Sequence, residues 1–227
     1  MGGKMEQKHF QEAITKLEPY KKKFTQTYEL IINLRELDLK KPENHIEAWV
    51  KLPSGLGKEI KICAIVGPEL AEQAKESCNT VITPDDFPKY VGDKKAIKKL
   101  AEKHDYFIAQ ANIMADIAKN FGRVLGPRGK MPNPKAGCVV PPNANLNTLS
   151  ENLRRTVRIA AKAQPSIKTA IGSEAMKPED VAANCMAVYT TVARKLPNEQ
   201  NNIKSVMIKK TMSPPALVSE KGAEVLK

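Results

Sequence analysis

Long apolar runs, aromatic side chains and clustered metal ligands are scarce in this chain of 227 residues. No apolar stretch approaches the roughly 18 residues that a membrane-spanning helix needs, so we predict no membrane partner. The first residues lack the apolar core of a signal peptide, and Glu6 stands where a myristoylation signal requires Ser or Thr. We therefore expect a cytoplasmic location. Aromatic residues form only 5% of the chain, which leaves few side chains to stack on successive bases.

Cysteine and histidine form no pattern that is typical of metal binding. The cysteines are far apart, without a C-x-x-C pair, and each lies among apolar or small residues: Cys63, Cys78, Cys138 and Cys185. This setting favours buried thiols in a reducing cytosol. The three histidines are scattered at His9, His45 and His104. We therefore predict no metal site.

Catalytic motifs are also missing. Gly129-Lys130 resembles the end of a phosphate-binding P-loop, but Val124 stands where the first Gly is required. Met131 stands where Ser or Thr would hold Mg²⁺. The residues 55–57, Gly-Leu-Gly, precede a predicted strand and so differ from a dinucleotide fingerprint, which follows one. We predict no enzymatic activity, no cofactor and no small-molecule substrate.

Positive charge is the strongest compositional signal. The net charge is +12 and the isoelectric point is about 9.5, which indicates an acidic partner, most often nucleic acid. The run 126–135 holds three prolines, two glycines and three positive charges without a carboxylate. Proline fixes φ and glycine permits positive φ, so this run predicts a defined irregular loop. Such a loop suits a polyanion, and the alternative is a solvated basic turn.

Two patterns of hydrophobicity divide the chain. Short buried strands alternate with helices from residue 59, as in a parallel, doubly wound α/β sheet; the strands are 60–66, 80–83, 106–109 and 139–140, and the helices 68–75, 94–103, 113–120 and 147–154. The flanking parts suit helices on one face of an antiparallel sheet, with helices at 6–17 and 178–195 and strands at 28–34, 46–52, 157–159, 168–171 and 205–209. We predict a discontinuous domain of residues 1–58 plus 156–227, with residues 59–155 inserted.

Basic and hydroxyl side chains cluster twice in the outer domain, which holds 22 Lys and Arg against 14 Asp and Glu. One cluster is 21–27 (Lys-Lys-Lys-Phe-Thr-Gln-Thr) and the other is 209–214 (Lys-Lys-Thr-Met-Ser-Pro). If strands 28–34 and 205–209 are neighbours, both clusters form one surface that suits phosphates and 2′-hydroxyls. Phe24 either stacks on a base or fills the core, and alone the core is favoured. The lysines of helix 94–103 are interpreted as a solvated face.

At this point the residues resemble the ribosomal protein L-one family, which forms the mobile stalk of the large ribosomal subunit. The strongest element is 125–134 (Leu-Gly-Pro-Arg-Gly-Lys-Met-Pro-Asn-Pro). Supporting elements are 24–29, 41–44, 107–111 and 210–212. The residues at 24–26 and 42–44 resemble those of the archaeal branch of the family. The resemblance implies a discontinuous α/β sandwich and an inserted Rossmann-like three-layer α/β/α domain, joined by a hinge near 55–58 and 155–156.

The family's partners follow from the same resemblance. It implies that the outer domain binds the stalk rRNA of the large subunit and that the protein helps to move deacylated tRNA out of the exit site. It also implies repression of translation through the leader of the protein's own mRNA. We expect a monomer when the protein is off the ribosome. Two alternatives stay open: a nucleotide-binding α/β enzyme, and a nonspecific basic nucleic-acid binder.

The predicted RNA contacts combine the basic clusters with positions that match the family's motifs. They are Lys22, Lys23, Phe24, Thr25, Thr27, Glu29, Lys210, Thr211, Met212 and Ser213. Ser213 replaces the Gly of the family's Thr-Met-Gly-Pro motif, where Gly serves close approach or a positive φ, so the local geometry is in question. The loop residues Arg128, Lys130, Asn133 and Lys135 are candidates for RNA contact or for holding the hinge.

Overall fold

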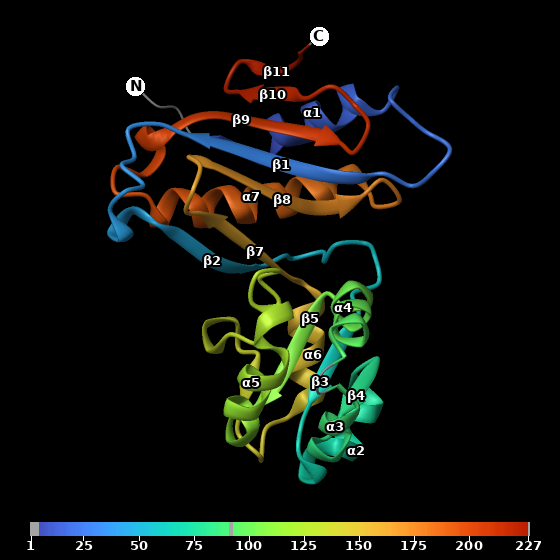
Figure 1. The fold of residues 1–227 in the computed structure, drawn as a ribbon. Coiled ribbons are helices and arrows are strands. Elements are labelled where there is room, and N and C mark those ends of the chain that lie inside the picture. Colours follow the sequence, from blue (N-terminus) through green and yellow to red (C-terminus); the bar gives the residue numbers. More distant parts are fainter. Residues whose placement is uncertain (1–4, 91–92, 227) are drawn as a thin grey trace. The chain divides into compact units, whose positions relative to one another are not determined.

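The computed structural model describes residues 5–90 and 93–226. The chain divides into two compact units, Met1–Lys58 with Arg155–Lys227 and Glu59–Arg154, which we call the outer unit and the inserted unit (Figure 1). The predicted division puts Arg155 in the insert. In the structure Arg155 lies in the outer unit, where its carbonyl accepts a hydrogen bond from the backbone N–H of Leu52 at 2.7 Å.

A five-stranded antiparallel sheet forms the centre of the outer unit, in the order β11-β10-β9-β1-β8. Its strands are β1 (Thr27–Leu34), β8 (Ser166–Ser173), β9 (Ile203–Lys210), β10 (Ala216–Ser219) and β11 (Gly222–Val225). A second sheet pairs β2 (Ile46–Lys51) with β7 (Thr156–Ala161) antiparallel. Burial alternates along β1, as expected where one face packs on a core and the other faces water.

Two helices cover one face of the five-stranded sheet. α1 (Gln7–Leu17) contacts β9, β10 and β11, and α7 (Pro178–Lys195) contacts β1, β8 and β2. α1 buries Phe10, Ile14 and Leu17 at helical spacing. Pro178 occupies the first turn of α7, where its missing N–H and fixed φ cost nothing. The predicted helices and strands of this unit are confirmed, apart from the β10–β11 hairpin, which the sequence did not predict.

The inserted unit contains a four-stranded parallel sheet in the order β4-β3-β5-β6. Its strands are β3 (Ile62–Ile65), β4 (Thr80–Ile82), β5 (Tyr106–Gln110) and β6 (Val139–Val140). Its helices are α2 (Pro68–Ser77), α3 (Phe87–Tyr90), α4 (Lys94–Lys103), α5 (Met114–Leu125) and α6 (Leu146–Arg154). α3, α4 and α5 share one apolar core with β3, β4 and β5, while α2 packs with α6. The predicted mixture of an antiparallel and a parallel α/β sheet is confirmed.

Short 3₁₀ helices complete the described chain, at Pro42–Asn44, Pro84–Asp86, Ala111–Ile113, Pro134–Ala136 and Glu199–Asn202. Cys63, Cys138 and Cys185 are buried, as predicted, whereas Cys78 is half-buried. Within residues 5–90 and 93–226, no helix has both the length and the apolarity to cross a membrane.

Candidate nucleic-acid interface

Three segments that are far apart in the sequence meet at one end of the five-stranded sheet. β1 lies between β8 and β9, and its first residues pair with their last ones, Thr27 with Ser173 and Tyr28 with Lys210. The prediction that the strands at 28–34 and 205–209 are neighbours is therefore confirmed. As a result, the residues 21–25, which we call the basic segment, lie beside the residues 210–213, which we call the β9 turn.

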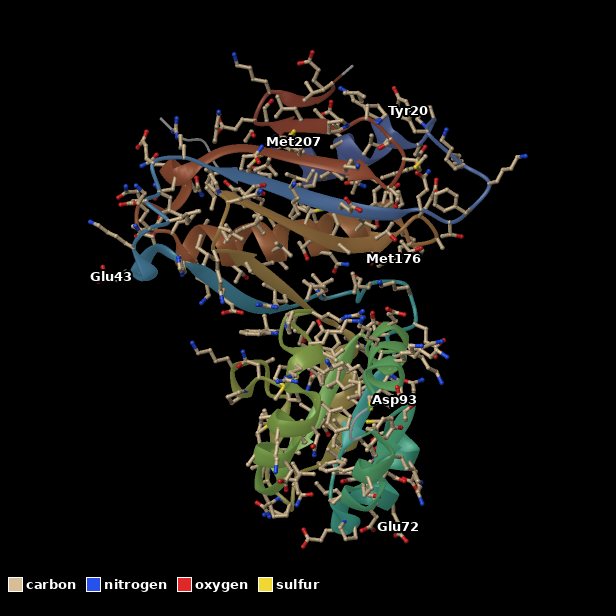
Figure 2. All side chains as sticks on the ribbon, viewed as in Figure 1. Tyr20, Glu43, Glu72, Asp93, Met176 and Met207 are labelled. Atoms are coloured by element: carbon tan, nitrogen blue, oxygen red, sulfur yellow. The ribbon has the colours of Figure 1, made fainter. Side chains whose placement is uncertain are left out.

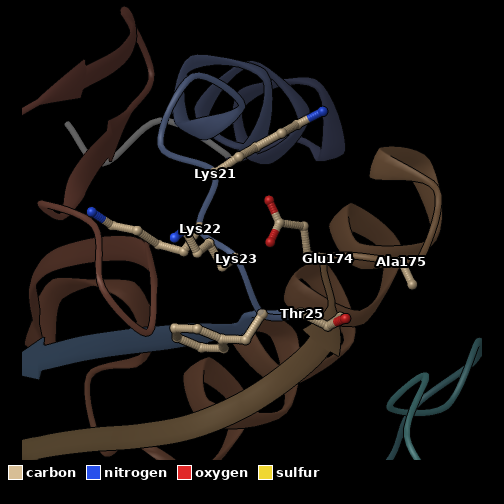
Figure 3. Close-up of a pocket in the computed structure, with 7 residues that line it drawn as sticks. Lys21, Lys22, Lys23, Thr25, Glu174 and Ala175 are labelled. Atoms are coloured by element: carbon tan, nitrogen blue, oxygen red, sulfur yellow. The ribbon is translucent and has the colours of Figure 1, made fainter.

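The basic segment is exposed along its whole length. With the turn that follows β8 it lines a shallow, open pocket of about 330 Å³, whose residues are Lys21, Lys22, Lys23, Phe24, Thr25, Glu174 and Ala175. Figure 3 shows the Glu174 carboxylate directed toward the basic segment. Three ammonium groups against one carboxylate leave this pocket with an excess of positive charge, which suits a phosphate-bearing ligand.

Two large apolar side chains project from the same end of the sheet. Phe24 is 52% exposed and Met212 is 61% exposed, and with Tyr20 they are three of the four exposed large apolar side chains of the described residues. The interpretation of Phe24 as a core residue is therefore wrong. Full burial of such a side chain would stabilise the protein by about 1.5–3 kcal/mol. Because Phe24 and Met212 are exposed, the fold does not gain this stabilisation from either. Their position beside lysines fits contact with the bases or riboses of a nucleic acid.

A buried ion pair lies beneath these exposed residues. The Nζ of Lys210 is 2.7 Å from the Oε1 of Glu174, and it lies 5.6 Å from the centre of the Tyr28 ring. The hydrogen bond from Lys210 holds the pKa of Glu174 below its usual value, and burial raises the pKa of Tyr28 to about 12. Lys210 is only 1% exposed. Its prediction as a residue that contacts RNA is corrected, because its ammonium group is used inside the protein.

Gln26 connects the basic segment to both neighbouring turns and is fully buried. Its side-chain Nε2 donates to the carbonyl of Tyr20 at 2.7 Å, and its Oε1 accepts from the backbone N–H of Met212 at 3.0 Å. Its backbone N–H donates to the Oε2 of Glu174 at 3.3 Å, and its carbonyl accepts from the Glu174 N–H at 2.8 Å. Because buried polar groups need their partners, these bonds fix the segment and the β9 turn relative to each other.

The predicted hydroxyl residues lie at the same place. The Oγ1 of Thr211 accepts from the backbone N–H of Thr27 at 3.2 Å, and the Thr211 backbone N–H donates to the Thr27 carbonyl at 3.1 Å. Thr211 is exposed, so its hydroxyl retains access to a ligand. Thr27 and Glu29 are half-buried and lie on the sheet face opposite the helices, where Lys209 pairs across from Glu29.

Ser213 resolves the question that its replacement of Gly raised. It is absent from the residues with positive φ in the described chain, so no glycine is required here for backbone conformation. Its Oγ accepts from the Lys210 N–H at 2.8 Å and donates to the Pro214 carbonyl at 2.9 Å. Ser213 is 9% exposed. Its hydroxyl therefore closes the β9 turn internally, which corrects its prediction as an RNA contact.

Contacts within the inserted unit hold the basic loop at 126–135. Arg128 forms an ion pair with Glu102 at 3.0 Å, and the Nζ of Lys130 donates to the carbonyls of Ala101 and His104 at 2.7 and 2.6 Å, at the end of α4. The Oδ1 of Asn133 accepts from the backbone N–H of Lys135 at 2.8 Å and so caps the 3₁₀ helix that follows. Lys135 is exposed. The structure thus gives Lys130 and Asn133 structural roles.

At the strand ends of the inserted unit, the backbone donor at the start of α2 is already used inside the protein. The N–H of Gly67, at the start of α2, donates to the Oε1 of Gln110 at 2.7 Å, and Gln110 is only 3% exposed. Glu69 lies 3.4 Å from the Gln110 Nε2. This backbone donor, which would face a phosphate in a nucleotide-binding fold, already has a protein partner. In the described part of the chain, no group of three His, Cys, Asp or Glu residues is arranged to hold a metal ion.

Sequence reasoning missed the residues that position the interface. Glu174 lies just beyond the predicted strand 168–171, and nothing in its sequence neighbourhood marks it. The sequence marks Tyr28 as a strand residue and as part of the family element 24–29, and neither indicates that its ring lies close to the Lys210 ammonium group. The buried part of the site depends on pairing between segments more than 140 residues apart, such as Gln26 and Glu174, so no local pattern reveals it.

Comparison with known proteins agrees with this architecture. Residues 14–214 match the ribosomal protein L1p/L10e family. The large ribosomal subunit protein uL1 of Methanothermococcus thermolithotrophicus is 46% identical over 197 residues, which cover 87% of this chain and 90% of the relative. The proteins of the same name from Methanococcus vannielii (42% over 214 residues, 94% and 97%) and Nanoarchaeum equitans (43% over 198 residues, 86% and 91%) are similar. The similarity to these archaeal proteins confirms the resemblance that the motifs indicate, and the chain therefore belongs to the ribosomal protein L1p/L10e family.

Proposed function

We propose that this protein is a non-enzymatic component of the large ribosomal subunit and that its outer unit binds the stalk rRNA. The relatives that it matches over nearly their whole length are named as large ribosomal subunit proteins. The observation that carries the proposal is the joint exposure of Phe24 and Met212 beside three lysines, above a buried hydrogen-bond network. Exposed apolar side chains with a fixed polar support are typical of a recognition surface.

In this proposal the lysines contribute affinity, and the apolar and hydroxyl side chains contribute specificity. Lys22 and Lys23 attract phosphates, which supplies affinity that falls with salt but reads no sequence. Phe24 and Met212 offer apolar surface to an unstacked base or a ribose, and Thr27 and Thr211 offer hydroxyls to a 2′-OH. The A-form major groove is too deep and narrow for side chains to read, so we expect recognition of shape and of the 2′-OH.

We further propose that the rRNA-bound protein helps deacylated tRNA to leave the exit site. We also propose that it represses translation by binding the leader of its own mRNA. Repression follows if the leader presents the same RNA shape as the stalk, because one surface would then serve both ligands. The free protein should be a monomer, because the described residues expose few large apolar side chains beyond those of the proposed RNA surface.

Two alternatives make different predictions. A nucleotide-binding enzyme would need an open anion site at the strand ends of the inserted unit, and the Gly67–Gln110 hydrogen bond with the nearby Glu69 argues against one. A nonspecific basic binder needs no exposed Phe24 and no buried support for it. The geometry of the outer unit therefore favours a specific RNA ligand.

Equilibrium binding to a stalk rRNA fragment and to a scrambled RNA of equal length tests the proposal. Both titrations are carried out across a range of salt concentrations with the full chain. We expect the preference for the stalk fragment to persist at high salt, because hydroxyl and apolar contacts are less screened than phosphate contacts. Equal affinities that fall together as salt rises would refute a specific site. Thermal stabilisation by ATP or GTP would instead support the enzymatic alternative.

A further inference from the structure

The helix α4 of the inserted unit presents a lysine face that the proposed rRNA site does not use. Five of its ten residues are exposed lysines: Lys94, Lys95, Lys98, Lys99 and Lys103. Figure 2 labels Asp93, which caps the start of this helix by accepting hydrogen bonds from the backbone N–H groups of Lys95 and Ala96 at 2.9 and 3.0 Å. The opposite side of α4 buries Ile97 and Ala101 in the apolar core. The orientation of the lysine face is therefore fixed by packing.

Acidic side chains do not neutralise this face. Glu102 is the one carboxylate within α4, and it pairs with Arg128 at 3.0 Å. Among the described residues, no carboxylate lies within ion-pair distance of the five lysines. Lys130 adds a further positive charge at the end of the helix, where it caps the carbonyls of Ala101 and His104. The loop 126–135 thus brings positive charge to this end of the helix, and it contains no carboxylate that could offset the lysines.

The spacing of the lysines destabilises the helix α4. Lys95, Lys99 and Lys103 follow one another at four-residue spacing, where like charges destabilise a helix. Lys94 and Lys95 also lie in the first turn, where the helix dipole disfavours positive charge; this turn contains no acidic residue of its own, and the carboxylate of the N-cap Asp93 offsets the dipole only in part. A solvated face needs neither feature, because alternating Glu and Lys would serve solubility and also stabilise the helix. The self-repulsion is relieved when a polyanion binds.

The chemistry of the face selects the kind of polyanion. Its side chains are point charges on flexible stems, without an apolar anchor, since every exposed large apolar side chain of the described residues lies in the outer unit. A stable protein interface or insertion into a membrane would need apolar anchors. Residues four apart rise by about 6 Å along a helix, which is similar to the separation of successive phosphates on one nucleic-acid strand.

We propose that the lysine face of α4 is a second RNA-binding surface, which takes the phosphate backbone without reading its sequence. It acts independently of the site on the outer unit. Its contribution is purely electrostatic, so it should appear in the affinity for any structured RNA and in the salt dependence of that affinity. It should not change the ratio between the affinities for cognate and scrambled RNA.

The test uses the full chain and a random-sequence RNA duplex. We compare Lys95→Gln/Lys99→Gln with the control Lys75→Gln/Lys119→Gln, which removes two exposed lysines from other helices of the same unit. The α4 variant should bind the duplex about fivefold more weakly near 0.1 M salt, and the slope of log K against log salt should shrink by about one to two units. The control should change affinity less than about twofold. The charge-retaining Lys95→Arg/Lys99→Arg should bind like the wild type.

Each outcome decides the proposal. If the α4 variant and the control lose the same affinity, the effect comes from net charge alone and the proposal is overturned. The proposal is also overturned if the arginine variant does not retain binding. Binding of polyglutamate or of anionic vesicles in place of RNA would assign the face to another partner. A loss that is equal for stalk and scrambled RNA supports the second surface. If instead the wild type shows no preference between these RNAs, the site on the outer unit fails and the α4 result still stands.

Discussion

Replacing Glu174 by glutamine removes one charge from the buried pair and keeps the shape of the side chain. The Lys210 ammonium, only 1% exposed, then faces a neutral amide oxygen at the place where it now contacts a carboxylate at 2.7 Å. Breaking a buried pair on one side costs about 3–5 kcal/mol. Three features lower that figure here: the Glu174 side chain is 17% exposed, the Tyr28 ring lies 5.6 Å from the Lys210 Nζ, and glutamine still accepts a hydrogen bond. We expect Glu174→Gln to destabilise the outer unit by about 2–3 kcal/mol.

Urea denaturation followed by tryptophan fluorescence measures this change. Trp49 is the single tryptophan and lies in β2 of the outer unit, so its signal reports the unit that carries the pair. A loss of about 2–3 kcal/mol shifts the midpoint by about 1–2 M urea for an ordinary slope. Binding of the stalk rRNA fragment under native conditions should also weaken, because Glu174 holds the backbone of Gln26.

The double variant Lys210→Met/Glu174→Gln is the control for charge. It removes both charges from the pair, and replacing a buried pair by uncharged groups of similar volume is often neutral. We therefore expect it to recover most of the stability that Glu174→Gln loses. A single variant within about 0.5 kcal/mol of the wild type would refute the reasoning. If the double variant loses as much stability as Glu174→Gln and Lys210→Met together, each measured as a single variant, the two charges do not interact.

Three further predictions concern recognition, acid and thiols. Phe24→Ala should weaken cognate RNA at least tenfold more than scrambled RNA in parallel titrations, whereas Lys22→Ala should weaken both alike and reduce the salt slope by about one unit or less. The Lys210 hydrogen bond lowers the pKa of Glu174, so ionised Glu174 stabilises the outer unit above pH 4.5, and this stabilisation is lost as the pH falls through the folded-state pKa. In Glu174→Gln the melting temperature should therefore fall less steeply with decreasing pH than in the wild type. Burial raises the pKa of all four thiols, and Cys78 alone is half-buried, so native labelling with iodoacetamide should modify Cys78 first and the others only on unfolding.

Periodic patterns predict most elements of this fold because each element buries a face of its own. α4 is an example: Ile97 and Ala101 recur at helical spacing, and the helix has the predicted bounds Lys94–Lys103. The hairpin β10–β11 escapes such reasoning because its strands have four residues each, too few for an alternation to stand out. The helix α5 extends to Leu125, beyond the predicted end at 120, because Phe121, Val124 and Leu125 continue its buried face.

The candidate site is predictable only in part, because the same residue type serves opposite purposes there. Lys22 and Lys210 are both members of lysine-rich clusters, yet one is exposed and the other is buried against Glu174. The alternation of β1 and its register with β9 decide this difference, since Lys210 pairs with the buried Tyr28 and Lys209 with the outward Glu29. Register across two distant strands is a property of the folded sheet. Phe24 is a similar case: it is exposed in a segment that Gln26, two residues on, joins to the distant β9 turn.

The two proposed RNA surfaces differ in how their side chains are held. Gln26 and Glu174 order the basic segment and the β9 turn before any ligand arrives, so the entropy of ordering the backbone is not lost on binding. Preorganisation of this kind favours discrimination, because an incorrect RNA cannot gain contacts by remodelling the surface. Among the described residues, no hydrogen-bond network of this kind holds the lysine side chains of α4, so their flexible stems would let them adapt to phosphates in different positions. Weakening the Gln26–Glu174 network should therefore lower the ratio between cognate and scrambled RNA, whereas neutralising α4 should leave that ratio unchanged.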